Sequence, residues 1–346
     1  MKAMKIGFVG VGSISGIYLE NISKMYHNVE LYAVCDLVKE KALQAQEKYN
    51  IPKLYDTMEE LFADPQVDIV LNITRPYEHY EVTKAALLAG KPVYSEKPLA
   101  ATVKEGAELV ALAKEKGLLL GGAPDTYMGA GIQTCKKLIQ DGYIGKPIGA
   151  AAKLICHGHE SWHPDPAFYY QHGGGPMMDM GPYYVTALVN LLGRVQSTMS
   201  VAKTSFATRT ITSQPHYGEV IQVEVPTHVN GILNFASGAV GTIITSFDVY
   251  YKADSPIEIY GSEGTLYVPD PNTFHGPVKL LRPEDGEIKE VPLCFGYKEN
   301  SRGRGLSEMA QALEDGKMAF SCDCTQTFHV LQIMEALTKG GSAQLQ

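Results

Sequence analysis

Two glycines near the start of the chain follow a short apolar segment, with a spacing that suits phosphate binding. The letters from Gly10 to Ser15 read GVGSIS, so a serine stands where the common G-x-G-x-x-G pattern has its third glycine. Gly10 permits a tight turn, and Gly12 lets the backbone approach a pyrophosphate closely. The N–H groups of Ser13 and Ile14, at the start of the next helix, would bind its oxygens. The pattern predicts a dinucleotide-binding turn.

Asp36 is the candidate partner of that turn. It follows the apolar segment Glu30–Cys35 and lies about 20 residues beyond Ser15, the usual distance for such a carboxylate. A carboxylate there accepts hydrogen bonds from the ribose hydroxyls of a dinucleotide and repels a 2′-phosphate. We therefore expect NAD(H) to be preferred over NADP(H). The alternative is a plain glycine turn with a solvated aspartate at a strand end.

The glycine turn and Asp36 both follow predicted strands, so a sheet must position them. Residues 1–122 have the sequence pattern of such a sheet. Short apolar segments alternate with stretches of 3.6-residue periodicity, which is typical of a doubly wound parallel sheet with helices on both faces. We predict an α/β N-terminal Rossmann domain, NAD-binding, over residues 1–122. Its expected strands are Lys5–Val11, Glu30–Cys35, Val67–Ile73, Pro92–Ser95 and Leu118–Gly121, and its expected helices include Val38–Tyr49, Tyr77–Ala89 and Val103–Lys116.

Residues 123–346 have a different pattern. A helix is expected over Ile132–Asp141, and turn residues then become abundant, with hairpins predicted around Ser237-Gly238 and between Gly261 and Gly264. This predicts an α+β C-terminal domain with a mostly antiparallel sheet, which binds substrate on one face. The other face needs cover, so we expect a homo-oligomer (dimer, tetramer or hexamer) that associates through this domain.

Composition disfavours several classes of protein. The 346 residues include 30 Lys and Arg against 38 Asp and Glu, a net charge of −8, which argues against nucleic-acid and anionic-membrane partners. No apolar run approaches the length of a membrane span. The six cysteines show neither zinc-finger nor disulfide-framework spacing. A cytoplasmic protein with a small-molecule substrate is expected.

Three further motifs carry a family resemblance. They are NITRPYEH (Asn72–His79), AGKPVYSEKP (Ala89–Pro98) and GGGPMMDMG (Gly173–Gly181). With the glycine turn, they make the chain resemble the Gfo/Idh/MocA family of oxidoreductases over nearly its whole length. The resemblance implies an NAD-dependent enzyme that transfers a hydride between nicotinamide and a secondary alcohol of a sugar, glycoside or cyclitol. Two alternatives stay open: a glycoside-cleaving or epimerising enzyme that recycles its NAD, and a non-enzymatic cofactor-sensing regulator.

The resemblance implies that Lys97 lies beside the nicotinamide and the reacting carbinol, with Glu96 on the ribose side. The position of Lys97 supports this role independently, because ligands of α/β sheets bind at the carboxyl ends of the strands. A lysine there can take or donate the hydroxyl proton. Thr74, Arg75 and His79 are further expected cofactor contacts, and a cis Lys97–Pro98 bond is expected. The alternative is a surface lysine paired with Glu96.

Where members of the family often read D-x-x-x-H, this chain has Asp179 and Tyr183. Residues four apart share one helical face, so both side chains could converge on a substrate. We expect Asp179 to orient Lys97 or a substrate hydroxyl. Tyrosine is a poorer base than histidine at neutral pH, so we expect Tyr183 to donate a hydrogen bond to the substrate oxygen. Alternatively, Tyr183 is a packed aromatic residue at a helix start.

Four histidines crowd into the segment that follows Cys156. The preferred interpretation is a substrate-binding loop with His159, Trp162 and His163, and with Tyr127 as a further substrate contact. His163 is the expected replacement for the missing family histidine. A metal site built from the histidines and Glu160 is an alternative, because imidazole and carboxylate are good zinc ligands, but we expect no metal. Plain structural histidines are the third interpretation.

Overall fold

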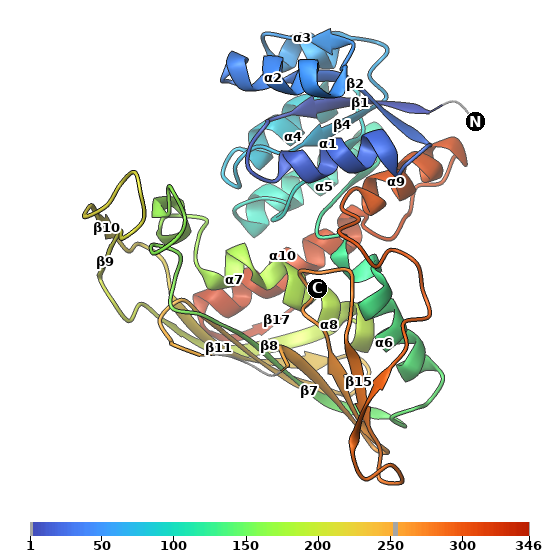
Figure 1. Cartoon of the computed structure of the whole chain (residues 1–346), viewed down its shortest axis with the longest axis vertical. Coiled ribbons are helices and arrows are strands. Elements are labelled where there is room, and N and C mark those ends of the chain that lie inside the picture. The colour runs from blue at the N-terminus through green and yellow to red at the C-terminus, as the bar shows by residue number, and fades with distance from the viewer. Residues whose placement is uncertain (1–2, 252–254, 346) are drawn as a thin grey trace. The chain divides into compact units, whose positions relative to one another are not determined.

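The structure is a computed structural model that describes residues 3–251 and 255–345. The chain divides into two units, which Figure 1 shows with helices and strands labelled. The segment that carries helix α9 and the first part of helix α10 belongs to the first unit, although it lies near the end of the chain. The predicted border between residues 122 and 123 stays a prediction. The first unit comprises the residues up to Met128 and Asn300–Leu331, and the second comprises Gly129–Glu299 and the residues from Gln332 onward.

A six-stranded parallel sheet forms the centre of the first unit, with the strand order β3-β2-β1-β4-β5-β6. Its inner strands are apolar and buried along almost their whole length, as expected when helices cover both faces of a parallel sheet. The predicted doubly wound fold is thereby confirmed. The strands are β1 (Met4–Val9), β2 (Val29–Cys35), β3 (Lys53–Leu54), β4 (Ile69–Asn72), β5 (Val93–Ser95) and β6 (Leu120–Gly122).

Helices connect these strands, and two of them begin at a reciprocal cap. Thr57 and Thr102 each accept a hydrogen bond from the backbone three residues on, and Glu60 and Glu105 return one, so both helix starts are encoded locally. The helices of this unit are α1 (Ser15–Lys24), α2 (Lys39–Tyr49), α3 (Met58–Ala63), α4 (His79–Leu88), α5 (Val103–Lys116) and α9 (Arg304–Glu314), with a 3₁₀ turn at Thr126–Met128; α10 (Cys324–Lys339) begins here and ends in the second unit.

A nine-stranded sheet forms the second unit, in the order β16-β15-β14-β13-β7-β12-β11-β8-β17. Only the β7–β12 pair is parallel, so the predicted, mostly antiparallel sheet is confirmed. Burial alternates along β11, so one face of the sheet is covered and the other is open. The strands are β7 (Pro147–Ile155), β8 (Val195–Lys203), β11 (His228–Phe235), β12 (Val240–Ser246), β13 (Ile257–Gly261), β14 (Thr265–Val268), β15 (Val278–Leu281), β16 (Ile288–Val291) and β17 (Gly341–Gln344).

Helices α6 (Ala130–Gln140), α7 (Pro176–Asp179) and α8 (Gly181–Leu192) pack on this sheet (Figure 1). A two-stranded flap, β9 (Thr208–Thr210) and β10 (Val220–Gln222), extends from the same unit. The flap has a small core of its own, which anchors it to the loop after β7. That core consists of Tyr170, Ile211, Ile221 and Phe247. Among the described residues, no helix is long and apolar enough to cross a membrane.

Candidate active site

The glycine turn has the geometry that its sequence predicts. Gly10 has a φ of +92°, and a Cβ atom there would lie 2.7 Å from the carbonyl oxygen of Ile73. Its N–H donates to the carbonyl of Cys35 at 3.0 Å. The turn is thus pressed between the ends of β2 and β4, and only glycine fits at its first position.

Ser15 takes the place of the third glycine without opening the turn. Its hydroxyl donates to the carbonyl of Gly12 at 2.7 Å, and its side chain is buried. A Cβ atom at Gly12 would meet nothing within 4 Å, so the space beside the turn is open to a ligand. The N–H groups of Ser13 and Ile14 have no acceptor within the described residues. These groups fit a pyrophosphate at the start of α1.

Asp36 is fixed against this turn. Its Oδ2 accepts the N–H of Val11 at 2.5 Å, and its Oδ1 accepts the N–H of Val38 at 2.7 Å. The carboxylate is therefore oriented by the backbone on both sides, and each oxygen keeps a lone pair for a further donor. This arrangement fits a ribose diol.

The three expected cofactor contacts after β4 differ in burial and in hydrogen-bond partners. Arg75 is mostly exposed and pairs with Glu78 at 3.0 Å. The N–H and hydroxyl of Thr74 donate to Asn72. His79 is buried, with Nδ1 2.7 Å from the carbonyl oxygen of Pro98 and Nε2 3.0 Å from that of Thr74. His79 thus joins the ends of two strands and has the contacts of a positioning residue.

Lys97 follows β5, the strand between β4 and β6, and the Lys97–Pro98 bond is cis as expected. Its backbone N–H donates to Oε2 of Glu96 at 2.9 Å. The other oxygen of Glu96 accepts the hydroxyl of Tyr18 at 2.7 Å, and the carboxylate is buried. Glu96 therefore fixes the backbone at Lys97, a role that the sequence did not indicate.

In the second unit, Asp179 and Tyr183 do not share one helix. Helix α7 ends at Asp179 and α8 begins at Gly181, with Met180 between them. The expectation of one continuous helical face is wrong because Pro182, with no N–H to donate, stands in the first turn of α8. Tyr183 is buried, and Asp179 keeps 18% of its side chain exposed.

The structure pairs Asp179 with His159. Nε2 of His159 lies 3.7 Å from Oδ2 of Asp179, and the imidazole keeps 14% of its surface exposed. Nδ1 of His163 instead accepts the backbone N–H of Asp165 at 3.0 Å, and partial burial lowers the pKa of His163. His159, rather than His163, is the histidine that the structure brings to this carboxylate.

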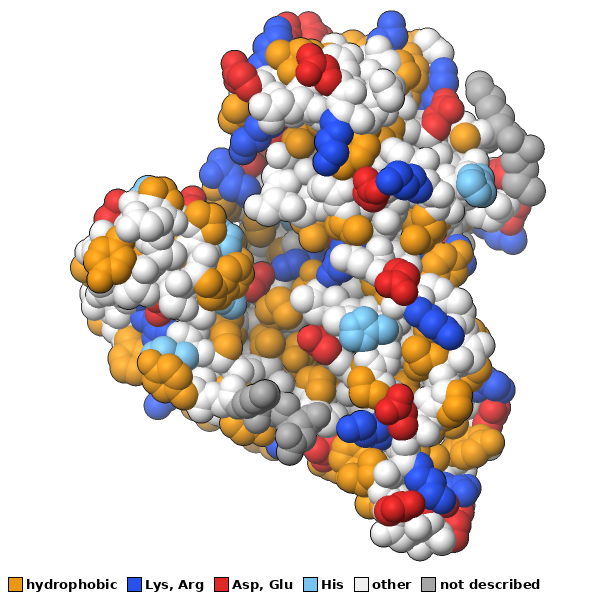
Figure 2. Space-filling model, viewed as in Figure 1, with side chains coloured by type: hydrophobic (Ala, Val, Ile, Leu, Met, Phe, Trp, Pro, Cys, Tyr) orange, Lys and Arg blue, Asp and Glu red, His pale blue; other side chains and the backbone are white. Residues whose placement is uncertain are grey.

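Aromatic rings surround this loop. The ring of His159 packs edge-on against Trp162, Tyr169 and Phe247, with ring centres 5.3, 4.3 and 4.6 Å away. Trp162 itself is 61% exposed. Figure 2 shows hydrophobic side chains and histidines gathered on the lobe that carries the flap. An exposed indole beside a carboxylate–imidazole pair fits the predicted platform for a sugar face.

Tyr127 and Glu160, the carboxylate of the alternative metal site, each have a polar partner within the protein. Tyr127 lies in the first unit, buried, with its hydroxyl donating to the carbonyl of Ser321 at 2.5 Å. The carboxylate of Glu160 is paired with Arg209. Within residues 3–251 and 255–345, no group of three or more His, Cys, Asp or Glu side chains could hold a metal ion.

Two family models match the chain one after the other. "Oxidoreductase family, NAD-binding Rossmann fold" matches residues 4–122, and "GFO/IDH/MocA C-terminal domain" matches residues 132–267. The chain belongs to the Gfo/Idh/MocA family of oxidoreductases. The predicted family, the enzyme class and the NAD cofactor are confirmed. The glycine turn and Asp36 lie in the part that matches the NAD-binding model.

Curated relatives are similar to this chain over most of its length, and a solved structure shares its fold. Myo-inositol 2-dehydrogenase of Thermotoga maritima is 27% identical over 91% of this chain and 93% of its own length. Trans-1,2-dihydrobenzene-1,2-diol dehydrogenase of Mus musculus is 27% identical over 84% of this chain and 80% of its own. The structure of levoglucosan dehydrogenase in complex with NADH has a TM-score of 0.83 at 19% identity and covers 100% of both chains. That last likeness concerns the fold.

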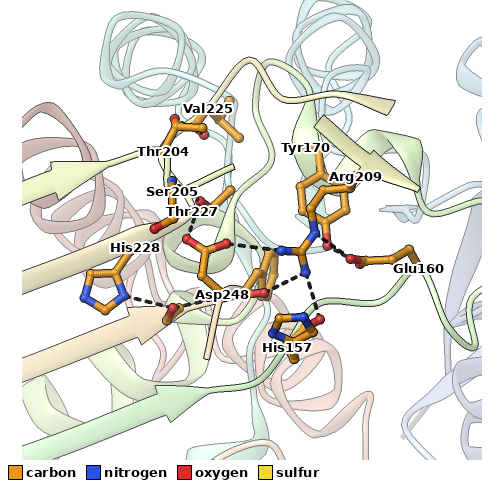
Figure 3. Close-up of polar contacts among 12 residues, drawn as sticks. His157, Glu160, Tyr170, Thr204, Ser205, Arg209, Val225, Thr227, His228 and Asp248 are labelled. Atoms are coloured by element: carbon orange, nitrogen blue, oxygen red, sulfur yellow. Dashed lines mark hydrogen bonds and ion pairs between the residues drawn. The ribbon is translucent and has the colours of Figure 1, made fainter. Parts of the chain in front are cut away.

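Sequence reasoning missed two residues that position others, and it considered Glu160 only as a possible metal ligand. The missed residues are Tyr18 and Arg209, both buried, whose polar partners Glu96 and Glu160 lie far away in the sequence (Figure 3 shows Arg209 with Glu160). An arginine in a short polar strand gives no local signal, because its partners are set by tertiary packing. Only Tyr18, in the helix after the glycine turn, stands at a place where a contact with the strand ends could have been suspected.

Proposed function

We propose that this protein oxidises, or in reverse forms, a secondary alcohol of a sugar, glycoside or cyclitol, with NAD as the redox cofactor. The observation that carries the proposal is Lys97, a lysine at the carboxyl end of the inner strand β5 in an NAD-binding unit. Ligands of such sheets bind at this edge. A lysine there is the group best placed to exchange a proton with a carbinol.

Each residue of the proposed site has a separate role in the reaction. The nicotinamide, when bound, supplies the hydride acceptor or donor. Nζ of Lys97 takes the hydroxyl proton in the oxidation direction and returns it in the reduction. Glu96 and His79 hold the backbone around Lys97, so that its stem starts from a fixed point. Asp179 and Tyr183 are proposed to orient the substrate hydroxyls.

The substrate class rests on the relatives and on the loop after β7. The two curated relatives are named as dehydrogenases of inositol and of a cyclic 1,2-diol, both ring compounds with adjacent hydroxyls. The exposed indole of Trp162 beside His159 supports a ring substrate with an apolar face.

We also propose a cellular location, a class of partner and an oligomeric state for the enzyme. The cysteines are all unpaired within the described residues, which supports the reducing cytoplasm. The net charge of −8 supports small-molecule partners rather than nucleic acid. The open face of the nine-stranded sheet supports a homo-oligomer.

Steady-state NADH formation tests the function. The purified protein is incubated with NAD and a panel of cyclitols, aldoses and glycosides. We expect NADH to form with at least one ring polyol. Lys97→Met should lower turnover by roughly 10²–10⁴-fold, the usual contribution of acid–base catalysis, with NAD affinity nearly unchanged. No NADH from any polyol, or near-native turnover of Lys97→Met, would contradict the proposal. Product formation without net NADH would support the alternative that recycles the cofactor.

A further inference from the structure

The carboxyl ends of two neighbouring parallel strands carry two buried carboxylates. Glu96 follows β5 directly, and Asp125 comes shortly after β6, the strand next to β5. The two strand ends are joined, since the N–H of Ala123 donates to the carbonyl of Ser95 at 2.9 Å. The side chain of Asp125 is only 1% exposed. Glu96 fixes the backbone at Lys97, whereas the proposed reaction assigns no role to Asp125.

Only one oxygen of the Asp125 carboxylate has hydrogen-bond partners. Oδ2 accepts the N–H groups of Gly303 and Gly305 at 2.8 and 3.1 Å. Oδ1 is buried and has no partner within residues 3–251 and 255–345. The oxygen of an asparagine amide could accept the same two N–H groups, so the cap of α9 does not require a charge. Because burying a charge is costly, an acidic side chain at this place indicates a further role.

Several titratable or charged groups of the first unit act on Asp125. Burial, together with the nearby Glu96, raises the pKa of Asp125 to about 6, whereas Arg302 and the two N–H groups at Oδ2 oppose the shift. The groups with electrostatic influence are Tyr18 of α1, Tyr94 and Glu96 in and after β5, and Arg302 and Cys322 of the segment from Asn300 to Leu331.

The charge of Asp125 changes near neutral pH against a steady background. Burial raises the pKa of Tyr18, Tyr94 and Cys322 above their ordinary values, so these three groups stay uncharged. Arginine side chains stay protonated in proteins, so Arg302 contributes the same charge at every pH. A rise in pH through about 6 therefore adds one negative charge at Asp125.

The cofactor itself differs by one charge between its two oxidation states. The nicotinamide ring is positive in NAD⁺ and neutral in NADH. A negative charge held near the ring stabilises the oxidised form relative to the reduced one. A buried charge is screened by salt much less than one at the surface. The ionised carboxylate of Asp125 is a group that can discriminate between the two states.

We propose that Asp125 is a specificity-determining residue for the oxidation state of the cofactor, and that its ionised carboxylate favours NAD⁺ over NADH. This inference rests on the proposed function for the place of the nicotinamide beside Lys97. Protonation at Oδ1 leaves Oδ2 free to accept the N–H groups of Gly303 and Gly305. The preference for NAD⁺ therefore increases with pH while the start of α9 keeps its cap.

Cofactor titrations without any substrate test this inference. NADH binding is followed by its fluorescence, and NAD⁺ binding by displacement of NADH, at intervals from pH 5 to pH 7.5. The ratio of the Kd of NADH to the Kd of NAD⁺ measures the preference. The Lys97→Met protein is the parent for all measurements, because an amine beside the ring would add an effect of its own. We expect the ratio of the parent to rise by about threefold or more over this range.

Two asparagine variants of the parent form a matched pair. Asp125→Asn removes the charge and keeps the cap of α9, and its ratio should be that of the parent at pH 5 but about threefold or more lower at pH 7.5. Comparison at each pH cancels the contribution of His79, whose pKa is lowered by burial. Asp64 also accepts a backbone N–H, that of Gln66 at 2.8 Å, but it precedes β4 and lies toward the amino ends of the strands. Asp64→Asn should therefore leave the ratio unchanged.

Three results would overturn the proposal. They are a ratio of the parent that is constant from pH 5 to pH 7.5, equal ratios of the parent and Asp125→Asn at pH 7.5, and equal changes in Asp125→Asn and Asp64→Asn. Asp125→Ser, whose hydroxyl can also cap a helix, takes the place of Asp125→Asn if that variant does not fold. Because the titrations need no polyol, a protein that oxidises none could still show the dependence on Asp125, so failure of the proposed function is distinguished from failure of this inference.

Discussion

The hydroxyl of Tyr18 donates a hydrogen bond to the buried carboxylate of Glu96 at 2.7 Å. Tyr18 lies in α1, directly after the glycine turn, and Glu96 precedes Lys97. Burial and the nearby carboxylate raise the pKa of Tyr18 well above its ordinary value, so the hydroxyl stays a donor. This one contact ties the helix that follows the cofactor turn to the backbone of the proposed catalytic lysine.

Tyr18→Phe should therefore affect both stability and turnover. The substitution leaves a buried carboxylate oxygen without its donor, which costs about 1–3 kcal/mol of unfolding free energy. We expect this loss in urea unfolding, together with a lower kcat. Tyr80→Phe is the matched control, since Tyr80 also donates to a glutamate, Glu108, but on the surface. An equal effect of the two substitutions would show that burial does not matter here.

Asp36→Ser should narrow the preference for NAD(H) over NADP(H). The carboxylate that would repel a 2′-phosphate is removed, and the N–H groups of Val11 and Val38 lose their acceptor. We expect weaker NADH binding and tighter NADPH binding in fluorescence titrations. Asp36→Asn, which removes the charge and keeps the shape, should shift the preference in the same direction. Equal affinity of the native protein for both cofactors would contradict the assignment.

Local sequence patterns were sufficient to predict the expected cofactor-binding residues. The glycine turn and Asp36 lie at strand ends that apolar periodicity locates, and the structure joins them by a direct hydrogen bond. The pairing of Asp179 with His159 could not be predicted, because it depends on the helix break at Met180 and on the path of a loop that Arg209 fixes. Spacing along the chain does not carry that information.

The position of the segment after Glu299 was also beyond the sequence patterns. It joins the first unit partly because the carboxylate of Asp125 accepts the N–H groups of Gly303 and Gly305 at 2.8 and 3.1 Å. These bonds satisfy the start of α9. They connect residues that are 178 and 180 positions apart, a distance at which periodicity gives no signal.

Asp125 should give the stability of the protein a specific pH dependence. Burial raises the pKa of Asp125 to about 6, against an ordinary value near 3.9. The folded state then binds this proton more tightly than the unfolded state, so the contribution of Asp125 to the unfolding free energy falls as the pH rises from about 4 to about 6 and is level above that. The fall amounts to roughly 3 kcal/mol. Asp125→Asn should remove this slope in urea unfolding measured across the same range, and an unchanged slope would contradict the assignment.

Charges on the open sheet face should dissociate the proposed homo-oligomer. Met199, Val201 and Ile232 are exposed on β8 and β11, and Met199 lies directly opposite Ile232. We expect native protein to be oligomeric at micromolar concentration and Ile232→Asp to be monomeric by light scattering, with an unchanged fold by circular dichroism. Val220→Asp, at an exposed apolar position of the flap, is the control and should stay oligomeric. A monomeric native protein would rule out the oligomer.

Tyr183→Phe decides between the two interpretations of the residue that stands in place of the family histidine. If the hydroxyl donates to the substrate oxygen, its removal should lower kcat/KM by tenfold or more, which corresponds to about 1.4 kcal/mol, the value of one good hydrogen bond. If Tyr183 only packs at the start of α8, the change should be within about twofold. Tyr184→Phe is the matched control, because Tyr184 is similarly buried on the same helix, and burial raises the pKa of Tyr184, so its hydroxyl stays protonated. A large loss in Tyr183→Phe alone supports the donor role.

Losses of the same size in Tyr183→Phe and Tyr184→Phe would mean that the substitutions disturb the helix, and that the Tyr183 hydroxyl has no special role. Near-native activity of Tyr183→Phe would leave orientation of the substrate hydroxyls to Asp179 and His159.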